Sequence, residues 1–443
     1  MKRICLTIFF TILCYTGSPA QELFSLKQCI ETGLERNYSI RIVRNEEQIA
    51  ANNATPGNAG YLPTVDLNSG FNGTNYNYDY NYADGTSGKE NGVHSEIANV
   101  GVNVDWTVFD GFGIQADYAK LKELQRLGEL NTRLTIEDFV ADIAGEYYNL
   151  IRQKIRLSNL RSAVNLSKER LRIVEARYYI GSMSSLDLQQ AKVDFNTDSS
   201  RLLTQFEVVH TSRIRLSELM AFDPVERKLN VRDSVIYPNA ALEEDELWQN
   251  TLTNNASLLV SQKNMTLSEL DYKKARNRNY PYVKLNTGYG YAANWYDTGV
   301  TDRQRRLGFN YGLTVGFTLF DGLNRRREQR NARIRIKNSE LLMQELELSL
   351  KADHSNLWMA YQSNLERWTL EKESLIAAQK YYLIAIERYK LGELSGIELR
   401  EAQNSLLEAE ERRSIAEYNI KLCEISLMQL SGQILTYLGC GSE

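Results

Sequence analysis

The sequence VDWTVFDG at residues 104–111 returns as VGFTLFDG at residues 315–322, an offset of 315 − 104 = 211. The blocks RYYIG at residues 177–181 and RYKLG at residues 388–392 have the same offset, 388 − 177 = 211. Self-similarity at a fixed offset is typical of a structural unit that occurs twice in one chain. The constant spacing also predicts a rigid element of fixed length between the two kinds of block in each half.

A third block agrees with this duplication after a small insertion. YLPTVDL at residues 61–67 resembles YPYVKL at residues 280–285, and Val65 and Val283 are separated by 283 − 65 = 218. Each half is expected to contain a short helix, a β-hairpin, a long helix, a turn and a further helix. We divide the chain into a signal peptide at 1–20, a first repeat at 21–220, a linker at 221–241, a second repeat at 242–433 and a short tail at 434–443.

The segment between the Asp-Gly pair and the Tyr-x-x-Gly block of each half has the periodicity of a coiled coil. Apolar and aromatic residues recur there at steps of three and four. They include Val140, Ile143, Tyr147 and Leu150 in the first half, and Trp358, Tyr361, Leu365 and Trp368 in the second. A helix of roughly 66 residues is ~100 Å long, so it must pack against neighbours along its length.

The hairpin strands alternate in polarity. Val102, Val104 and Trp106 alternate with Asn103 and Asp105, and residues 312–319 repeat the phase. Strands of about ten residues with this pattern are typical of a membrane barrel, although a soluble sheet with one wet face looks the same locally. The signal peptide and the aromatic residues favour the barrel. The polar segments 75–88 and 294–303 are expected to be outward-facing loops.

Four strands cannot close a membrane barrel, since such barrels start at about eight strands. We therefore expect the chain to oligomerise. Two copies would give eight strands, whose interior is filled by side chains, whereas three copies would give twelve and leave room for a lumen.

The N-terminus has the pattern of a secretory signal. Lys2 and Arg3 precede an apolar run at 4–15, and Ser18-Pro19-Ala20 supplies small residues for cleavage before Gln21. Cys14 is a candidate lipidation site, but Leu13 occupies the position directly before it, where a lipoprotein signal requires a small residue. No later segment approaches the 18 apolar residues that would indicate a membrane helix. The formal charge of −4 becomes −4 − 2 = −6 on maturation, which argues against nucleic acid as a partner.

The sequence contains no cluster of residues that could carry catalysis or hold a cofactor or metal. The three histidines have no metal-ligand spacing, and no glycine loop could cradle a phosphate. We therefore predict that the chain is not an enzyme and does not power transport itself. Cleavage leaves the scattered cysteines Cys29, Cys423 and Cys440, which allow one disulfide without indicating which pair forms it.

These motifs together resemble the TolC-type outer membrane efflux family over residues 24–433. The motifs are the paired FDG strand ends, the Leu-Pro and Tyr-Pro dipeptides before the first strands, and the turns at 177–191 and 388–402. The resemblance implies an α+β membrane protein in which three chains form a twelve-stranded β-barrel, continued by a long α-helical coiled-coil barrel in the periplasm. It further implies a homotrimer in outer membrane lipid of a Gram-negative bacterium, with a periplasmic adaptor (membrane fusion) protein and an inner-membrane pump as partners.

The two helical turns are the candidate functional sites. Ser184 with Asp187, and Ser395 with Glu398, match the capping box that begins a helix. The resemblance implies two acidic residues facing the pore, six and nine residues after the turn glycine. In the second repeat these are Glu398 and Glu401, whereas the first repeat offers only Asp187. We predict a cation-selective constriction formed by Asp187, Glu398 and Glu401, of which Glu401 has no capping role.

Tyr178 and Tyr389 precede the turn glycines by three residues. Packing in the coiled-coil seam is the simpler interpretation, while the resemblance implies that Tyr389, with Tyr178 as its counterpart, belongs to a polar latch that holds the tip shut. The turns themselves are expected to contact the adaptor. Their residues are Gly181, Ser182, Met183, Ser184, Gly392, Glu393, Leu394 and Ser395.

The function predicted from the sequence is a passive exit duct of a tripartite efflux pump for small molecules. The outer membrane component of a type I protein secretion system is an alternative within the same class. A periplasmic structural coiled coil without a pore is an alternative from another class, and it predicts a soluble protein that gives no conductance in lipid bilayers. The sequence does not name the substrate, because a duct with a polar lumen need not recognise its cargo.

Overall fold

The computed structural model describes residues 23–226, 229–297 and 301–439. The predicted signal peptide, Cys14 and Cys440 lie outside these residues. The chain divides into a helical unit (Met1–Asn45, Leu130–Leu259 and Gln344–Glu443) and a strand unit (Glu46–Glu129 and Val260–Met343). Four helices, at residues 38–53, 113–179, 256–277 and 324–391, contribute residues to both units.

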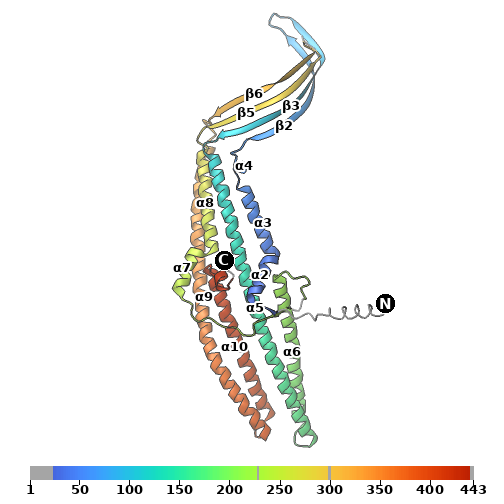
Figure 1. Ribbon diagram of the computed structural model, residues 1–443, viewed down its shortest axis with the longest axis vertical. Helices are drawn as coiled ribbons and strands as arrows, with labels where there is room; N and C mark the ends of the chain where they lie inside the picture. The colour runs from blue at the N-terminus through green and yellow to red at the C-terminus, as the bar shows by residue number, and fades with distance from the viewer. Residues whose placement is uncertain (1–22, 227–228, 298–300, 440–443) are drawn as a thin grey trace, which may run out of the picture. The chain divides into compact units, whose positions relative to one another are not determined.

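The two halves of the chain have the same order of major elements (Figure 1). The first half consists of α2 (Leu26–Arg36), α3 (Tyr38–Asn53), α4 (Pro56–Ala59), β2 (Thr64–Asn81), β3 (Ser87–Phe109), α5 (Gly113–Tyr179) and α6 (Ser185–Leu219). The second consists of α7 (Glu244–Asn254), α8 (Ala256–Asn277), β5 (Tyr282–Tyr296), β6 (Arg303–Gly316), α9 (Asn324–Leu391), α10 (Gly396–Leu430) and α11 (Ile434–Tyr437). The short strands β1 (Leu23–Phe24) and β4 (Asn230–Val231) pair in parallel. α5 has 67 residues and α9 has 68, close to the length expected from the spacing of the sequence blocks.

Four strands form one antiparallel sheet in the order β2-β3-β5-β6, so that β3 and β5 join the two hairpins. The register places Val102 opposite Leu67 on one side and Tyr289 on the other, and it places Asn103 opposite Asp66 and Gly288. Around these positions apolar side chains therefore share one face across the four strands, and Asn, Asp and Gly share the other. This register confirms the alternation seen in the sequence, and side chains on the apolar face, Leu67 and Val102 among them, are exposed in the single chain.

The strands are longer than the ten residues expected, because they include segments that we predicted to be loops. Asn75–Asn81 belongs to β2, and Ser87 begins β3. The rings of Tyr76, Tyr78 and Tyr80 follow one another along β2 at centroid distances of 6.1 and 5.5 Å. The prediction was wrong because the Asn-Tyr alternation has the two-residue period of a strand, and this period outweighs polar composition. In the same way Asn294–Tyr296 belongs to β5, and Arg303 begins β6.

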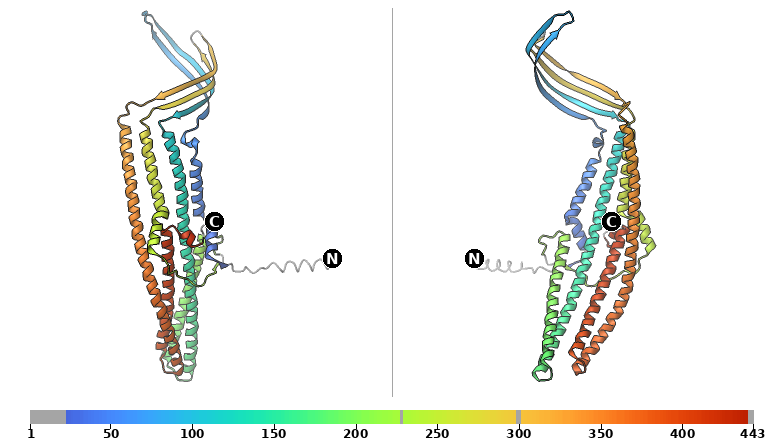
Figure 2. Two further views of the ribbon diagram at one scale, coloured as in Figure 1. Left: turned by 60° about the vertical axis from the view of Figure 1, so that its left-hand side comes forward. Right: turned by 180° about the vertical axis from the view of Figure 1, so that it is seen from behind.

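The helical unit is held together by the predicted seams. α6 runs back beside α5, and α10 runs back beside α9 (Figures 1 and 2). Val140, Ile143, Tyr147 and Leu150 of α5 are fully buried, and Tyr361 of α9 joins the same core. Burying each such side chain stabilises the fold by about 1.5–3 kcal/mol.

Cys29 and Cys423 are buried free thiols, so these two do not form a disulfide. Burial, helped by the charge of Asp233, raises the pKa of the Cys29 thiol to about 12. No helix in the described part of the chain combines the length and apolarity needed to cross a bilayer.

Candidate gate at the helical turns

Both turns are closed by the same local geometry. Gly181 and Gly392 have φ of +77° and +81°, the left-handed conformation that ends a helix and favours glycine. Ser395 Oγ then accepts from the backbone N–H of Glu398 over 3.3 Å. Glu398 Oε2 in return accepts from the N–H and the hydroxyl of Ser395 over 2.9 and 2.7 Å. The reciprocal bonds form the capping box that begins α10.

Ser184 and Asp187 form the equivalent capping box at the start of α6. Asp187 and Glu398 are therefore the third helical residues of two capping boxes, and both are exposed. The bonds from the backbone N–H and then the hydroxyl of Ser395 hold the pKa of Glu398 below its usual value. Capping and ionisation are compatible, since a capped carboxylate still presents a negative charge at the turn.

Glu401 lies one helical turn beyond Glu398 and is exposed. Its carboxylate makes no hydrogen bond or ion pair with any residue that the structure describes. The counterpart in the first half, Gln190, instead donates to Asp194 over 3.0 Å. The two turns thus differ at the position nine residues after the turn glycine. Only the second turn has an unpaired carboxylate at this position.

The two candidate latch tyrosines lie in different environments. Tyr389 is only 2 % exposed, and the guanidinium of Arg177 lies over its ring at 5.6 Å. Its hydroxyl has no hydrogen-bond partner among the described residues, and burial raises its pKa. Tyr178 is 38 % exposed and contacts the ring of Tyr179. Only Tyr389 combines a packed ring with an unsatisfied hydroxyl.

Arginines that the sequence motifs did not single out join the two halves of the chain near the turns. Arg177 donates to the carbonyl of Lys390 over 3.4 Å. Arg170 donates to the carbonyl of Gly396 over 3.5 Å and also pairs with Asp194 of its own half.

The strongest of these contacts is a bidentate ion pair between α10 and α6. Arg400 donates to the two carboxylate oxygens of Asp198 over 2.6 and 2.7 Å. One signal could have revealed it. Asp198 falls in a seven-residue series with Ala191, Gln205 and Ser212, all of them buried, and a carboxylate at such a seam position needs a charged partner.

The residues predicted to contact an adaptor are mostly exposed. The exceptions are Met183 and Leu394, which are half-buried. Leu394 packs against the small core that contains Tyr389 and Leu399. The most exposed apolar side chains beside the turns are instead Tyr179, Ile180, Leu186, Leu391 and Ile397.

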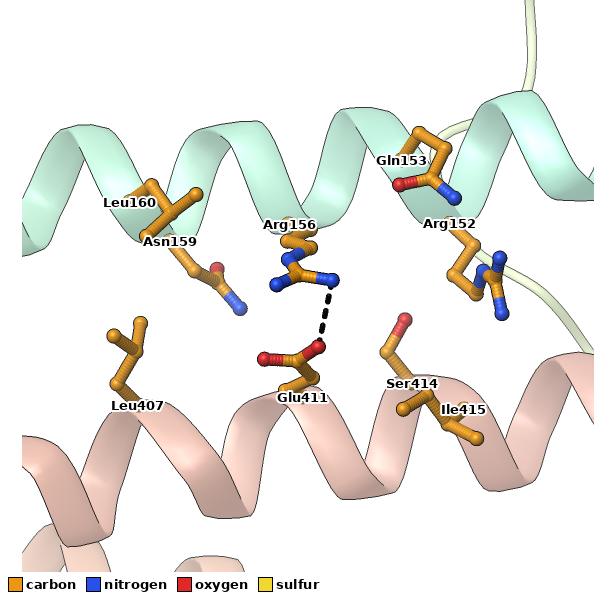
Figure 3. Close-up of a pocket in the computed structure, with 9 residues that line it drawn as sticks. All are labelled: Arg152, Gln153, Arg156, Asn159, Leu160, Leu407, Glu411, Ser414 and Ile415. Atoms are coloured by element: carbon orange, nitrogen blue, oxygen red, sulfur yellow. Dashed lines mark ion pairs between the residues drawn. The ribbon is translucent and has the colours of Figure 1, made fainter. Parts of the chain in front are cut away.

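Two cavities of the helical unit lie along the helices rather than at the turns, because their α5 residues precede Gly181 by 181 − 160 = 21 or more positions. One of about 80 Å³ lies between α5 and α10, and an ion pair of 2.8 Å between Arg156 and Glu411 crosses it (Figure 3). Its volume is that of a few water molecules. A wider, open groove of about 450 Å³ shares Arg156, Leu160, Leu407 and Glu411 with it. In the described residues, no group of His, Cys, Asp and Glu side chains could hold a metal ion.

Comparison with known proteins gives a consistent result. The model of the family described as outer membrane efflux protein matches residues 29–221 and 247–433. The outer membrane protein TolC of Vibrio cholerae is 19 % identical, with 98 % of this chain and 96 % of that protein covered. The CmeC outer membrane channel of Campylobacter jejuni has a TM-score of 0.78 at 15 % identity, covering 94 % of this chain and 90 % of that one. VceC, an outer membrane protein of Vibrio cholerae, has a TM-score of 0.72 at 17 % identity, covering 92 % and 96 %.

Proposed function

The chain belongs to the outer membrane efflux protein family, as its motifs indicated, and we propose from this premise that it is the passive exit duct of a tripartite efflux pump for small molecules. Three copies would form a channel that continues from a twelve-stranded barrel in the outer membrane into a helical barrel in the periplasm. An inner-membrane pump would supply the energy, and a periplasmic adaptor would join the two.

The observation that carries this proposal is the two-faced sheet with two free edges. Its apolar face, which includes Leu67, Val102 and Phe309, is exposed, as a lipid-facing surface must be. Its other face, lined by Asn, Asp and Gly, suits a water-filled lumen. Within the described ranges, β2 and β6 each pair on one side only. An unpaired edge strand exposes backbone N–H and C=O groups that can pair with a strand of another chain. Three chains of four strands would pair all their edges in one closed ring.

The helical turns are the proposed gate. Around a threefold axis, Glu398 and Glu401 would bring six carboxylates together. Negative charges at such short separations repel one another and attract cations. We propose that contacts such as those of Tyr389 and Arg400 hold the closed state. The exposed apolar side chains beside the turns, Ile180 and Leu391 among them, suit contact with an adaptor.

Membrane fractionation and planar-bilayer recording test this function directly. We expect the full-length protein in the outer membrane fraction, and stepwise conductance when the purified protein is added to a bilayer, with heat-denatured protein as the control. Recovery as a soluble periplasmic protein without conductance would instead establish the structural coiled coil. Deletion of the gene should raise sensitivity to toxic small molecules. Loss of a secreted protein with unchanged sensitivity would point to type I secretion.

A further inference from the structure

The start of α9 carries an excess of positive charge. Residues 325–337 contain six arginines and one lysine but a single acidic residue, Glu328. The N-terminus of a helix carries a partial positive charge, so cations in the first turn destabilise it. No acidic residue in that turn offsets them. The helix therefore carries these arginines at a cost to its own stability.

The equivalent segment of α5 has no such excess. Residues 114–126, which lie 211 positions earlier, hold three cations and two acidic residues. Each of those cations has a partner: Lys120 pairs with Asp271, Arg126 pairs with Glu123, and Lys122 lies over the ring of Tyr118. The charge excess therefore belongs to the second half alone and is not required to build such a helix.

Some of the α9 cations have clear structural roles. Arg325 pairs with Asp321 over 3.2 Å and donates to the carbonyl of Thr318 over 2.7 Å, which fixes the connection from β6 to α9. Arg333 donates to the hydroxyl of Tyr272 over 2.9 Å. Glu328, the single acidic residue within 325–337, forms an ion pair with Arg278 of α8.

Four other arginines, Arg326, Arg327, Arg330 and Arg335, are exposed, and none has an ion-pair partner among the described residues. We call these four the arginine patch. It lies directly beside apolar surface. Leu319 and Phe320, in the connection before α9, are 86 % and 76 % exposed and continue the sequence of the apolar β6 strand. Arg326 and Arg327 follow this exposed apolar segment in the first turn of α9, and Arg330 and Arg335 lie about one and two turns further along the helix. An apolar segment followed closely by unpaired arginines has the polarity profile of a membrane interface.

We propose that the arginine patch binds the phosphate groups of anionic phospholipids in the leaflet next to the helices. This inference rests on the proposed function, because it needs the sheet to lie in the membrane. The planar guanidinium donates in pairs to phosphate oxygens, so arginine suits this contact better than lysine. Lipid phosphate would also supply the negative charge that the first turn of α9 lacks. The interaction would hold the strand-to-helix connection at the membrane surface.

The test compares lipid selection by the full-length protein with that of two variants. The patch variant is R326Q/R327Q/R330Q/R335Q. The matched control, K168Q/K192Q/K351Q/K380Q, removes the same number of cations from exposed, unpaired positions on α5, α6 and α9 of the helical unit. Each protein is reconstituted into vesicles of phosphatidylcholine mixed with phosphatidylglycerol, and the lipid retained after gentle extraction is quantified.

We expect the wild type and the control to enrich phosphatidylglycerol by roughly five-fold, as a single well-formed contact would give, and the patch variant to lose the enrichment while still conducting. A wild type that conducts but retains both lipids equally would overturn this inference alone. A patch variant that loses its self-association, with lipid selection unchanged, would overturn it by assigning the arginines to a contact between copies. A chain that never enters the membrane would overturn the proposed function as well.

Discussion

Arg400 of α10 is bound to Asp198 of α6 through both carboxylate oxygens, at 2.6 and 2.7 Å, and Asp198 is only 1 % exposed. The pair joins the second helical pair of the chain to the first. Hydrogen bonding to Asp198 raises the pKa of Arg400, so the cation is retained at any ordinary pH. A charged pair in a packed seam fixes the register of helices, because any shift would leave a buried charge without its partner.

Removing Arg400 should therefore destabilise the helical unit. Arg400→Ala leaves the Asp198 carboxylate buried and unpaired, which typically costs about 3–5 kcal/mol. Arg156→Ala, which breaks the more exposed interhelical pair with Glu411, is the matched control and should cost under about 1 kcal/mol. Urea unfolding followed by circular dichroism measures both. Equal losses for the two variants would show that the Asp198 pair has no special role.

Two substitutions at Tyr389 should distinguish a role in packing from a role in the latch. Tyr389→Ala removes a buried ring and should cost about 3–5 kcal/mol. Tyr389→Phe keeps the ring and removes a hydroxyl without a partner in the chain, so stability should change by less than about 1 kcal/mol. If the hydroxyl bonds to a neighbouring copy in the closed gate, the Phe variant should still conduct more than the wild type. Tyr178→Phe, at the exposed counterpart, should change neither quantity.

Cys29 should resist alkylation in the folded protein. Its thiolate is the reactive form, and a pKa of about 12 leaves a minute fraction ionised at pH 8. In a Cys440→Ser background, iodoacetamide should label Cys29 and Cys423 only after unfolding, as followed by mass spectrometry. Rapid labelling of native Cys29 would mean that α2 is not packed as described. Failure to label after unfolding without a reductant would reveal a disulfide.

The two faces of β3 should respond oppositely to a charge. Val102→Lys places an ammonium on the apolar face, where it should hinder membrane insertion by up to about 2–4 kcal/mol. Asn103→Lys places the same group one residue further on, on the polar face, and should be tolerated. Yield in the outer membrane fraction compares them. Equal yields would indicate a sheet whose apolar face does not meet lipid.

Features with a strong period could be predicted from the sequence. The seam of Val140, Ile143 and Tyr147, the phase of the strand that contains Val102, and the capping box of Glu398 each depend on residues a few positions apart. Such patterns are set by local geometry, which the sequence reports directly. The prediction of a loop at residues 75–88 was wrong because it relied on polar composition rather than on the two-residue period of the Asn-Tyr alternation.

Contacts between distant segments could not be read in the same way. Asp198 and Arg400 are 400 − 198 = 202 residues apart, and nothing local links them. The environments of Tyr178 and Tyr389 differ although their flanking sequences match, because burial depends on what the rest of the fold brings to each turn. The duplication therefore predicts which elements form, while the differences between the halves arise from tertiary packing. The duplication itself remains a prediction from the sequence.

The proposed channel is cation-selective, and its constriction is formed by the second turn. The most direct test of this constriction is the reversal potential of single channels under a salt gradient, for the wild type and for Glu398→Gln with Glu401→Gln. Glutamine preserves the capping box, so the variant removes charge without unwinding α10, and Glu373→Gln, at an exposed site on α9, is the control. We predict cation preference for the wild type and the control, and its loss in the double variant. No conductance would contradict a channel, and the same reversal potential in all three proteins would contradict a constriction formed by Glu398 and Glu401.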